Sequence, residues 1–411
     1  MVKIGYKQTD IGIIPEDWEV KQIKDFADGT AGGTPSTQIN SFWGGNIKWM
    51  NSGELNNKII YDVVGRITEE GLNNSSTKLI PENCILIGLA GQGKTRGTVA
   101  INKVPLCTNQ SIAAIYPNEK YESLYLFYNL EYRYFELRSM STGDGGRGGL
   151  NLTIIRNILI PIPEKKEQKA IANALSDVDD LITAVEKLIA KKESIKTATM
   201  QQLLTGKKRL DGFSGKWEEK KLGEIAIFRR GSFPQPYGLS KWYDETNGAP
   251  FIQVYDVDKN MKLKSDTKQH ISDIAKNLSV FVKKDTVILT IQGSIGRIAI
   301  TQYDAYIDRT LLIFTNYLIP MDTIFFSYAV QELFRIEKEK AAGGTIKTIT
   351  KEELSNFTIL VPILNEQQAI AQILSDMDNE IEALKTKLSK TKAMKDGMMS
   401  ELLNGKTRLK V

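Results

Sequence analysis

Two long segments of the chain carry hydrophobic residues at helical spacing, one following Pro163 and one following Pro362. Intervals of three and four residues place these side chains on one face of a helix. Proline stands where each helix would begin, and Gly206 and Gly405 stand near where each would end. The candidate packing residues are Val178, Ile182, Val185 and Ile189 in the first segment and Met377, Ile381, Leu384 and Leu388 in the second, with Ile195, Leu203, Met394 and Leu402 extending the two stripes. The pattern predicts two helices of about 40 residues, each roughly 60 Å long. A pair of core helices and a coiled-coil spacer that also sets a distance are both open interpretations.

The chain repeats itself at a shift of 199 residues, which superimposes Pro362 on Pro163. The segment PEKKEQKAIANALSDVD then aligns with PILNEQQAIAQILSDMD, and LLTGKKRL aligns with LLNGKTRL, without a gap. The same shift pairs Trp18 with Trp217. A fixed period of this kind indicates a duplicated structural unit.

Each repeat combines a variable region with the shared helix. The variable regions, about 18–150 and 217–349, alternate β-rich runs such as NCILIGLAG and KDTVILTIQG with glycines, and each contains one aromatic, helix-like run. These features predict α+β globular domains. The predicted organisation is a first globular domain, a first helical region, a second globular domain and a second helical region, at residues 1–150, 151–213, 214–349 and 350–411.

Composition narrows the possible functions. A content of 41% apolar and 25% charged residues excludes a disordered or collagen-like chain. Two cysteines, Cys84 and Cys107, cannot form a zinc cage, and the single histidine, His270, excludes a His-based triad or a His-rich metal site. No catalytic or metal-binding residue is therefore assigned. The few cysteines, the lack of a long apolar run and the N-terminal sequence favour a cytoplasmic protein without a membrane partner. The net charge of +5 permits nucleic-acid binding without requiring it.

Residues 88–95 match the phosphate-loop pattern G-x-x-x-x-G-K-[ST]. A true phosphate loop leads directly into a helix whose N-terminus faces the phosphates. Here the next residues, RGTVAI, predict a strand, and the corresponding segment of the second repeat, QGSIGRIAI, lacks the Lys-Thr pair. An ATP-binding enzyme that uses this motif is therefore a less favoured alternative.

Three segments of each repeat mix polar, basic and aromatic residues: residues 30–52 and 228–256, a glycine turn after a buried strand, and the glycine-rich loops 141–153 and 341–350. Arg and Lys contact phosphates or guanine, Asn and Gln pair with adenine, and glycine lets the backbone approach a phosphate. In the first repeat the candidates for nucleic-acid contact are Thr34, Ser36, Thr37, Trp43, Lys48, Trp49, Asn51, Gln92, Lys94, Arg96, Asn109, Gln110 and Arg147. In the second repeat they are Arg229, Arg230, Ser232, Gln235, Tyr237, Lys241, Gln253, Gln292, Ser294, Arg297, Arg309 and Lys347. For any single side chain, the alternative interpretation is an exposed position in a solvated loop. These residues differ between the repeats while the helices agree, which suggests two recognition surfaces of different specificity on one shared fold.

These residues and the repeat resemble the DNA-specificity subunit of Type I restriction-modification systems. The resemblance is carried by IPEDWEVKQIKDFA, GGTPST and FWGGNIKWMN in the first repeat, by QGSIGRIAI in the second, and by the helix openings KEQKAIANALSDVDD and NEQQAIAQILSDMDN. It covers essentially the whole chain. It implies an α+β fold with two target-recognition domains, built on twisted β-sheets, that are joined and separated by two long antiparallel coiled-coil-like helices.

The resemblance also implies a function and partners. Each recognition domain is expected to read one half of a split, asymmetric site in double-stranded DNA. The helices are expected to dock two methyltransferase subunits, through which restriction-motor subunits join. The chain itself is expected to lack catalysis and cofactors, with S-adenosylmethionine, ATP and magnesium held by the partner subunits. The second repeat reads GSFPQP where the first reads GGTPST, so residue roles do not transfer directly. A coiled-coil scaffold that does not read DNA is the remaining alternative.

Overall fold

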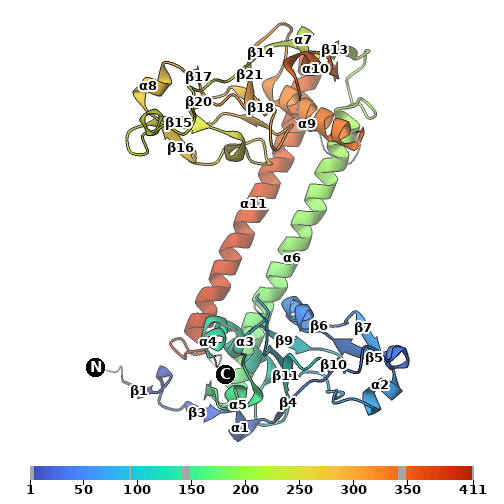
Figure 1. Ribbon diagram of the computed structural model, residues 1–411, viewed down its shortest axis with the longest axis vertical. Helices are drawn as coiled ribbons and strands as arrows, with labels where there is room; N and C mark the ends of the chain where they lie inside the picture. The colour runs from blue at the N-terminus through green and yellow to red at the C-terminus, as the bar shows by residue number, and fades with distance from the viewer. Residues whose placement is uncertain (1–3, 92–93, 141–148, 341–348, 410–411) are drawn as a thin grey trace. The chain divides into compact units, whose positions relative to one another are not determined.

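The computed structural model describes residues 4–91, 94–140, 149–340 and 349–409 (Figure 1). The chain forms two compact units. Residues 1–186 and 387–411 make the first unit, and residues 187–386 make the second. The domain boundaries predicted within each repeat, after residues 150, 213 and 349, stay a prediction. None of the described helices is long and apolar enough to cross a membrane.

The first unit contains a larger and a smaller β-sheet. The larger sheet has the order β4 (Gly29–Ala31), β11 (Ile112–Ile115), β8 (Ile85–Gly88), β9 (Val99–Asn102) and β6 (Ile59–Ile60). The smaller has the order β10 (Cys107–Thr108), β5 (Trp43–Met50) and β7 (Gly65–Ile67). Two further strand pairs are β1 (Tyr6–Thr9) with β2 (Gly12–Pro15), and β3 (Glu19–Gln22) with β12 (Leu159–Ile162). The helices are α1 (Ile23–Phe26), α2 (Glu69–Asn73), α3 (Ser123–Tyr132), α4 (Tyr134–Ser139) and α5 (Leu152–Arg156), with short 3-10 turns η1 (Asn40–Phe42) and η2 (Ser52–Asn57). The long helix α6 (Lys165–Leu203) begins in this unit and ends in the second. Strands β8, β9 and β11 are buried at every residue, which explains their continuous apolar sequence.

The second unit repeats this plan with two four-stranded sheets. One has the order β14 (Ala226–Arg230), β21 (Leu311–Tyr317), β18 (Val287–Thr290) and β19 (Ile298–Ile300). The other has the order β16 (Gln269–Ile271), β15 (Ala249–Ile252), β20 (Ala305–Ile307) and β17 (Val280–Val282). Strand β13 (Glu218–Lys221) pairs with β22 (Thr358–Val361). The helices are α7 (Leu222–Ile225), α8 (Asp273–Lys276), α9 (Thr323–Lys340) and α10 (Lys351–Asn356), with 3-10 turns η4 (Ser240–Trp242) and η5 (Val254–Asp256). The long helix α11 (Leu364–Leu402) begins in this unit and ends in the first.

The repeat predicted from the sequence is present in the structure. Helices α6 and α11 are each 39 residues long, and their bounds differ by the predicted 199 residues. The strand pairs β3–β12 and β13–β22 obey the same shift. The units differ between these landmarks, because β6 is the edge strand of the five-stranded sheet of the first unit, whereas β17 is the edge strand of the β16–β15–β20–β17 sheet of the second. The predicted fold class, a duplicated α+β domain with two long helices, is confirmed.

Helices α6 and α11 run antiparallel where they meet in each unit (Figure 1). In the first unit Asp179 pairs with Lys395 at 2.8 Å and Glu186 with Lys392 at 2.7 Å, so residue numbers rise along α6 as they fall along α11. In the second unit the same order appears for Glu193 with Lys385 at 2.8 Å and for Lys196 with Asp378 at 2.5 Å. Of the candidate packing residues, Val178, Val185, Ile189 and Ile381 are buried, and Ile182, Met377, Leu384 and Leu388 are half-buried.

The predicted extension of the stripe through Ile195 and Met394 is wrong. Their side chains are 41% and 48% exposed. Ile195 lies six residues after Ile189. At about 100° per residue, a step of six carries the side chain roughly 120° away from the apolar face. Helical spacing of three or four residues, rather than apolar character alone, therefore determines which positions pack.

The core of each unit contains residues of both repeats. In the first unit Met399, Leu402 and Leu403, from the end of α11 and just beyond, pack into the core that includes Trp18. In the second unit Met200, Leu203 and Leu204, from the end of α6 and just beyond, have the same place. Each globular region is therefore completed by the end of the other repeat's long helix.

Candidate nucleic-acid interface

Two tryptophans of β5 order the loop that follows β4 in the first unit. Trp43 donates its indole N–H to the carbonyl of Ser36, and Trp49 donates to that of Gly33, both at 3.0 Å. The two rings meet edge to face with centroids 5.0 Å apart. Both indole donors are used within the unit, so these predicted contact residues hold the loop in place.

Gln110 lies at the tip of the turn between β10 and β11. Asn109 fixes this turn in two ways. Its side-chain Oδ1 accepts a hydrogen bond from the backbone amide of Ser111 at 3.1 Å, and its backbone amide donates to the carbonyl of Met50 at 3.0 Å. The side chain of Gln110 is exposed, and the hydroxyl of Thr34 donates to its Oε1. The described residues give its Nε2 no hydrogen-bond acceptor. The amide of Gln110 is thus oriented at the surface with its donor group available.

Arg309 occupies the equivalent turn, between β20 and β21, in the second unit. Asp308 Oδ2 accepts the amide of Thr310 at 3.3 Å and its hydroxyl at 2.5 Å, and the amide of Asp308 donates to Ile252 at 3.0 Å. The Arg309 guanidinium lies over the ring of Tyr237, 5.0 Å from its centroid. Within the described part of the chain this guanidinium has neither an ion pair nor a hydrogen bond. The ring of Tyr237 therefore positions the guanidinium, and the N–H groups of the guanidinium remain available to donate hydrogen bonds.

A glycine makes each turn possible. A Cβ at Gly32 would lie 2.2 Å from the carbonyl oxygen of Thr108, and one at Gly231 would lie 2.3 Å from that of Ile307. Gly32 directly follows β4, and Gly231 directly follows β14. The loop that begins at each glycine, here called the crossing loop, therefore passes close against the backbone of the turn. Any side chain at either glycine would displace the turn and the residue at its tip.

A surface hollow of about 340 Å³ surrounds Arg309 in the second unit. Three predicted contact residues, Gln235, Tyr237 and Gln253, line it together with Arg309. Tyr255 also lines it, and burial raises the pKa of Tyr255 to about 12, so its hydroxyl keeps the proton that it donates to Gln253. The hollow therefore gathers amide, phenol and guanidinium groups from segments far apart in the sequence.

Two buried polar atoms beside this hollow, Tyr237 Oη and Asp308 Oδ1, have no hydrogen-bond partner among the described residues. Buried polar atoms of folded proteins are nearly always paired with protein, water or a ligand. Neither Tyr255 nor Thr310 was among the predicted contact residues. The Asp-x-Thr pattern of an Asx turn was the available signal for Thr310.

Several predicted contact residues are engaged inside their own unit. Asn51 caps η2, with Oδ1 accepting the amide of Gly53 at 2.8 Å. Lys48 pairs with Asp62 at 3.2 Å. Other engaged side chains are Ser232, which donates to Leu278 at 3.0 Å, Lys241, which lies 4.3 Å from the ring centroid of Trp242, and Arg297, which donates to Val257 at 3.2 Å.

The remaining predicted residues are distributed over other parts of the two units. Those with exposed side chains are Ser36, Thr37, Lys94, Arg229, Arg230 and Gln292, whereas Arg96 and Ser294 are half-buried. Lys94 borders a separate hollow of about 640 Å³ with Lys58, Tyr134 and Phe135. Gln92, Arg147 and Lys347 lie outside the described residues.

The phosphate-loop motif of residues 88–95 lies between two strands. Strand β8 ends at Gly88, and the chain returns as β9, which pairs antiparallel with it through Ile87 and Val99. The described residues around the motif therefore form strand, turn and strand, as the sequence predicted. The helix start that would face bound phosphates in a phosphate loop is not formed by these residues.

Each unit thus presents a different set of exposed polar side chains, and the turns at Gln110 and Arg309 share their backbone hydrogen bonds. This arrangement defines a binding protein with two related but non-identical surfaces. The family model described as the Type I restriction modification DNA specificity domain matches residues 15–197 and again residues 214–392. The chain belongs to this family and contains the domain twice.

Individual relatives agree with this assignment. The chain is 27% identical to the Type I restriction enzyme MjaIX specificity subunit of Methanocaldococcus jannaschii, over 98% of this chain and 96% of that protein. Its fold is similar to the S subunit of a Type I restriction-modification system from M. genitalium, with a TM-score of 0.59, 17% identity and coverage of 96% and 97% of the two chains. A chain from a structure concerned with complex assembly of the type I R-M system gives a TM-score of 0.64 at 17% identity, with coverage of 96% and 99%. The chain is accordingly a specificity subunit, the non-catalytic component, rather than an enzyme.

Proposed function

We propose that this chain reads a bipartite, asymmetric site in double-stranded DNA, with one half-site for each unit. The observation that carries the proposal is the matched turn with different tips, Gln110 in the first unit and Arg309 in the second. Identical surfaces would read identical half-sites, whereas two different surfaces read an asymmetric site. Amide and guanidinium groups at an exposed edge are the groups that read bases in the major groove.

Basic residues outside the two turns supply the contacts to the DNA backbone in this proposal. Arg229 and Arg230 are exposed at the end of β14, and Lys94 is exposed in the turn after β8. We expect Arg147 and Lys347 to contact phosphates as well. Phosphate contacts release counterions, so binding should weaken steeply as the salt concentration rises.

The proposal assigns chemistry to partner subunits. The chain brings two methyltransferase subunits to the DNA site, and through them restriction-motor subunits. S-adenosylmethionine, ATP and magnesium are held by those partners. Family membership supports this assignment, since restriction-modification couples specificity with methylation and cleavage.

Mapping of methylated adenines tests the proposal. Genomic DNA from cells that express the chain with its methyltransferase should carry methylation at a split, asymmetric motif, and DNA from cells lacking the chain should not. A continuous or symmetric motif would contradict reading by two different units. Methylation without any motif, together with no defined footprint, would favour a scaffold that does not read sequence.

Domain exchange assigns each half-site to a unit. Replacing residues 18–150 with the corresponding region of a relative should change one half of the motif and leave the other half unchanged. A chimera in which both halves change would show that the two regions do not read independently.

A further inference from the structure

We propose that Gln110 and Arg309 read one base pair each, an A·T pair in the first unit's half-site and a G·C pair in the second unit's half-site. This inference rests on the proposed function and assigns specificity to two individual residues. It starts from the equivalence of the two turns, which share their backbone hydrogen bonds and present different side chains at the tip.

The backbones of the two turns are held by matching hydrogen bonds. Beyond the bonds formed by Asn109 and Asp308, the amide of Leu89 donates to Ser111 at 2.8 Å, and that of Ile291 donates to Thr310 at 3.0 Å. The crossing loop is also attached in the same way, by Gly33 to Thr108 at 2.9 Å and by Ser232 to Ile307 at 3.0 Å. The tip residue is therefore presented from an equivalent position in each unit.

Each tip is positioned by a neighbour of suitable chemistry from the crossing loop. In the first unit the hydroxyl of Thr34 holds the amide oxygen of Gln110. In the second unit Tyr237 supports the guanidinium of Arg309 and itself packs on Phe233, with ring centroids 4.9 Å apart. Positioning before binding lowers the entropy lost when a side chain meets a base.

The residue at the tip is uncharged in the first unit and charged in the second, and this difference argues for base contacts. A position whose role was charge attraction to phosphate would keep a cation in both units, because that attraction does not depend on sequence. Gln110 has no charge, so the shared role of the two positions is better explained by base reading. The difference between them then corresponds to a difference in the base that is read.

The donor and acceptor groups identify the bases. A glutamine amide pairs with N6 and N7 of adenine, and a guanidinium pairs with O6 and N7 of guanine. Thr34 uses one lone pair of the Gln110 Oε1, which leaves the second lone pair and the Nε2 donor for adenine. Arg309 keeps its guanidinium edge for guanine, since Tyr237 contacts its face.

The test uses the full chain in complex with its methyltransferase and duplexes that carry the mapped site with single base-pair changes. For Arg309→Gln, discrimination at one G·C pair of the second unit's half-site should fall by about 5- to 150-fold. For Gln110→Arg, the preference at one A·T pair of the other half-site should move toward G·C. Thr34→Val should relax that same A·T position. Lys191→Gln, at an exposed position on α6, is the matched control and should change neither half-site.

The outcomes separate the inference from the function on which it rests. A wild-type complex that prefers no sequence would refute the proposed function before any variant is compared. A specific wild type whose base preferences survive Arg309→Gln and Gln110→Arg overturns the inference alone. Equal weakening on all sequences by Arg309→Gln, with a salt slope reduced by about one, also overturns it and marks a phosphate contact.

Discussion

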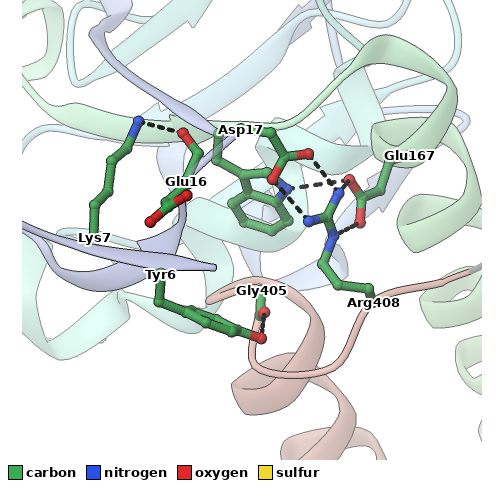
Figure 2. A network of polar contacts seen from close by, with 8 residues as sticks. Tyr6, Lys7, Glu16, Asp17, Glu167, Gly405 and Arg408 are labelled. Atoms are coloured by element: carbon green, nitrogen blue, oxygen red, sulfur yellow. Dashed lines mark hydrogen bonds and ion pairs between the residues drawn. The ribbon is translucent and has the colours of Figure 1, made fainter. Parts of the chain in front are cut away.

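The ends of the long helices are fastened by two clasps, one in each unit, which are built from equivalent residues. In the first clasp, Trp18 donates its indole N–H to Glu167 at 3.1 Å, and Arg408 donates to the same carboxylate at 2.5 and 2.7 Å (Figure 2). Glu167 stands in the first turn of α6, and Arg408 follows the end of α11. The clasp therefore joins the start of one long helix to the end of the other.

The second clasp repeats this arrangement with the helices exchanged. Trp217 donates to Glu366 at 3.1 Å, and Arg209 donates to that carboxylate through two bonds of 2.7 Å. Each residue lies 199 positions from its counterpart. The carboxylates are 2% and 1% exposed in the first and second clasp, so both are buried charges that need their arginines.

The clasps differ in the further partner of the arginine. Arg408 also forms two bonds with Asp17, at 2.9 and 2.8 Å, as Figure 2 shows, whereas Arg209 donates instead to the carbonyl of Gly215 at 2.7 Å. The buried pair is thus common to both units and its exposed neighbour is not. The two turn tips follow the same rule, because their backbone frame is shared and their exposed residues differ. The two repeats therefore share buried residues and backbone hydrogen bonds, and they differ in exposed side chains.

Removal of either arginine is expected to have the largest effect. Arg209→Ala leaves Glu366 buried without its ion-pair partner, and Arg408→Ala does the same to Glu167. Each should lower the free energy of unfolding by about 3–5 kcal/mol. Urea titration of the full chain measures this, and the two losses should agree within about 1 kcal/mol, since the buried pair is the same. A loss below about 1 kcal/mol in either variant would show that the clasp does not hold its unit together.

Alanine at the glycine that follows each long helix should have the next largest effect and should distinguish the clasps. Gly206 and Gly405 both have positive φ, 67° and 64°, which costs an L-residue about 1–2 kcal/mol. A Cβ at Gly405 would also lie 2.5 Å from Pro15 Cδ, whereas the nearest atom to one at Gly206 is 3.5 Å away, on Trp217. Gly405→Ala should therefore lose about 1–3 kcal/mol more than Gly206→Ala in the same titration. Equal losses would mean that the hairpin carrying Pro15 moves aside without cost.

The helices and the duplication were predictable because their signals are periodic. Apolar spacing located α6 and α11, and the shift of 199 residues matched their bounds. The clasp residues obey the same shift, but the sequence does not show that Arg408 pairs with Glu167 rather than with Glu366. That choice follows from the antiparallel packing of the helices, which brings the end of one long helix to the start of the other.

The recognition surfaces were predicted as segments but not as contacts. Thr34 meets Gln110, and Tyr237 meets Arg309, across more than 70 residues of sequence in each unit. These contacts depend on the order of the strands in each sheet. The sequence of a short apolar strand does not specify which other strands it pairs with. The strand orders illustrate this, since the two globular regions have sheets of five and three strands in one unit and of four and four in the other.

A smaller effect is expected where α3 meets α11. Lys395 contacts Asp179 at 2.8 Å and Glu131 at 3.1 Å. In the second unit Lys196 lies over the ring of Tyr328 as Lys395 lies over that of Tyr128, so Gln331, three residues after Tyr328, stands at the position of Glu131. Burial alone would lower the pKa of Lys395, but the two carboxylates outweigh it and raise that pKa above its ordinary value. Glu131→Gln copies the second unit and should lower the free energy of unfolding by about 1–2 kcal/mol. An unchanged value in urea titration would show that Asp179 alone satisfies Lys395.

The smallest effect is expected at Asp17, the exposed partner that only the first clasp has. Hydrogen bonding to Arg408 lowers the pKa of Asp17 below its ordinary value of 3.8. Its contribution to stability is therefore fully present above pH 3.8 and is lost as the pH falls through the lowered pKa of the folded state. Because the side chain is 65% exposed and screened by solvent, Asp17→Asn should cost less than about 1 kcal/mol at pH 7.

The difference between the wild-type chain and Asp17→Asn should then shrink as the pH falls below 3.8, because the wild-type carboxyl becomes protonated as well. Urea titrations of both chains at pH 7 and at a series of acidic pH values test this dependence. The second clasp provides the control, because Lys216 stands at the position of Asp17 and cannot form this bond with Arg209. Lys216→Gln should therefore leave the free energy of unfolding nearly unchanged at all of these pH values. A loss from Asp17→Asn as large as that from Arg408→Ala would mean that the exposed carboxylate, rather than the buried Glu167, holds the first clasp closed.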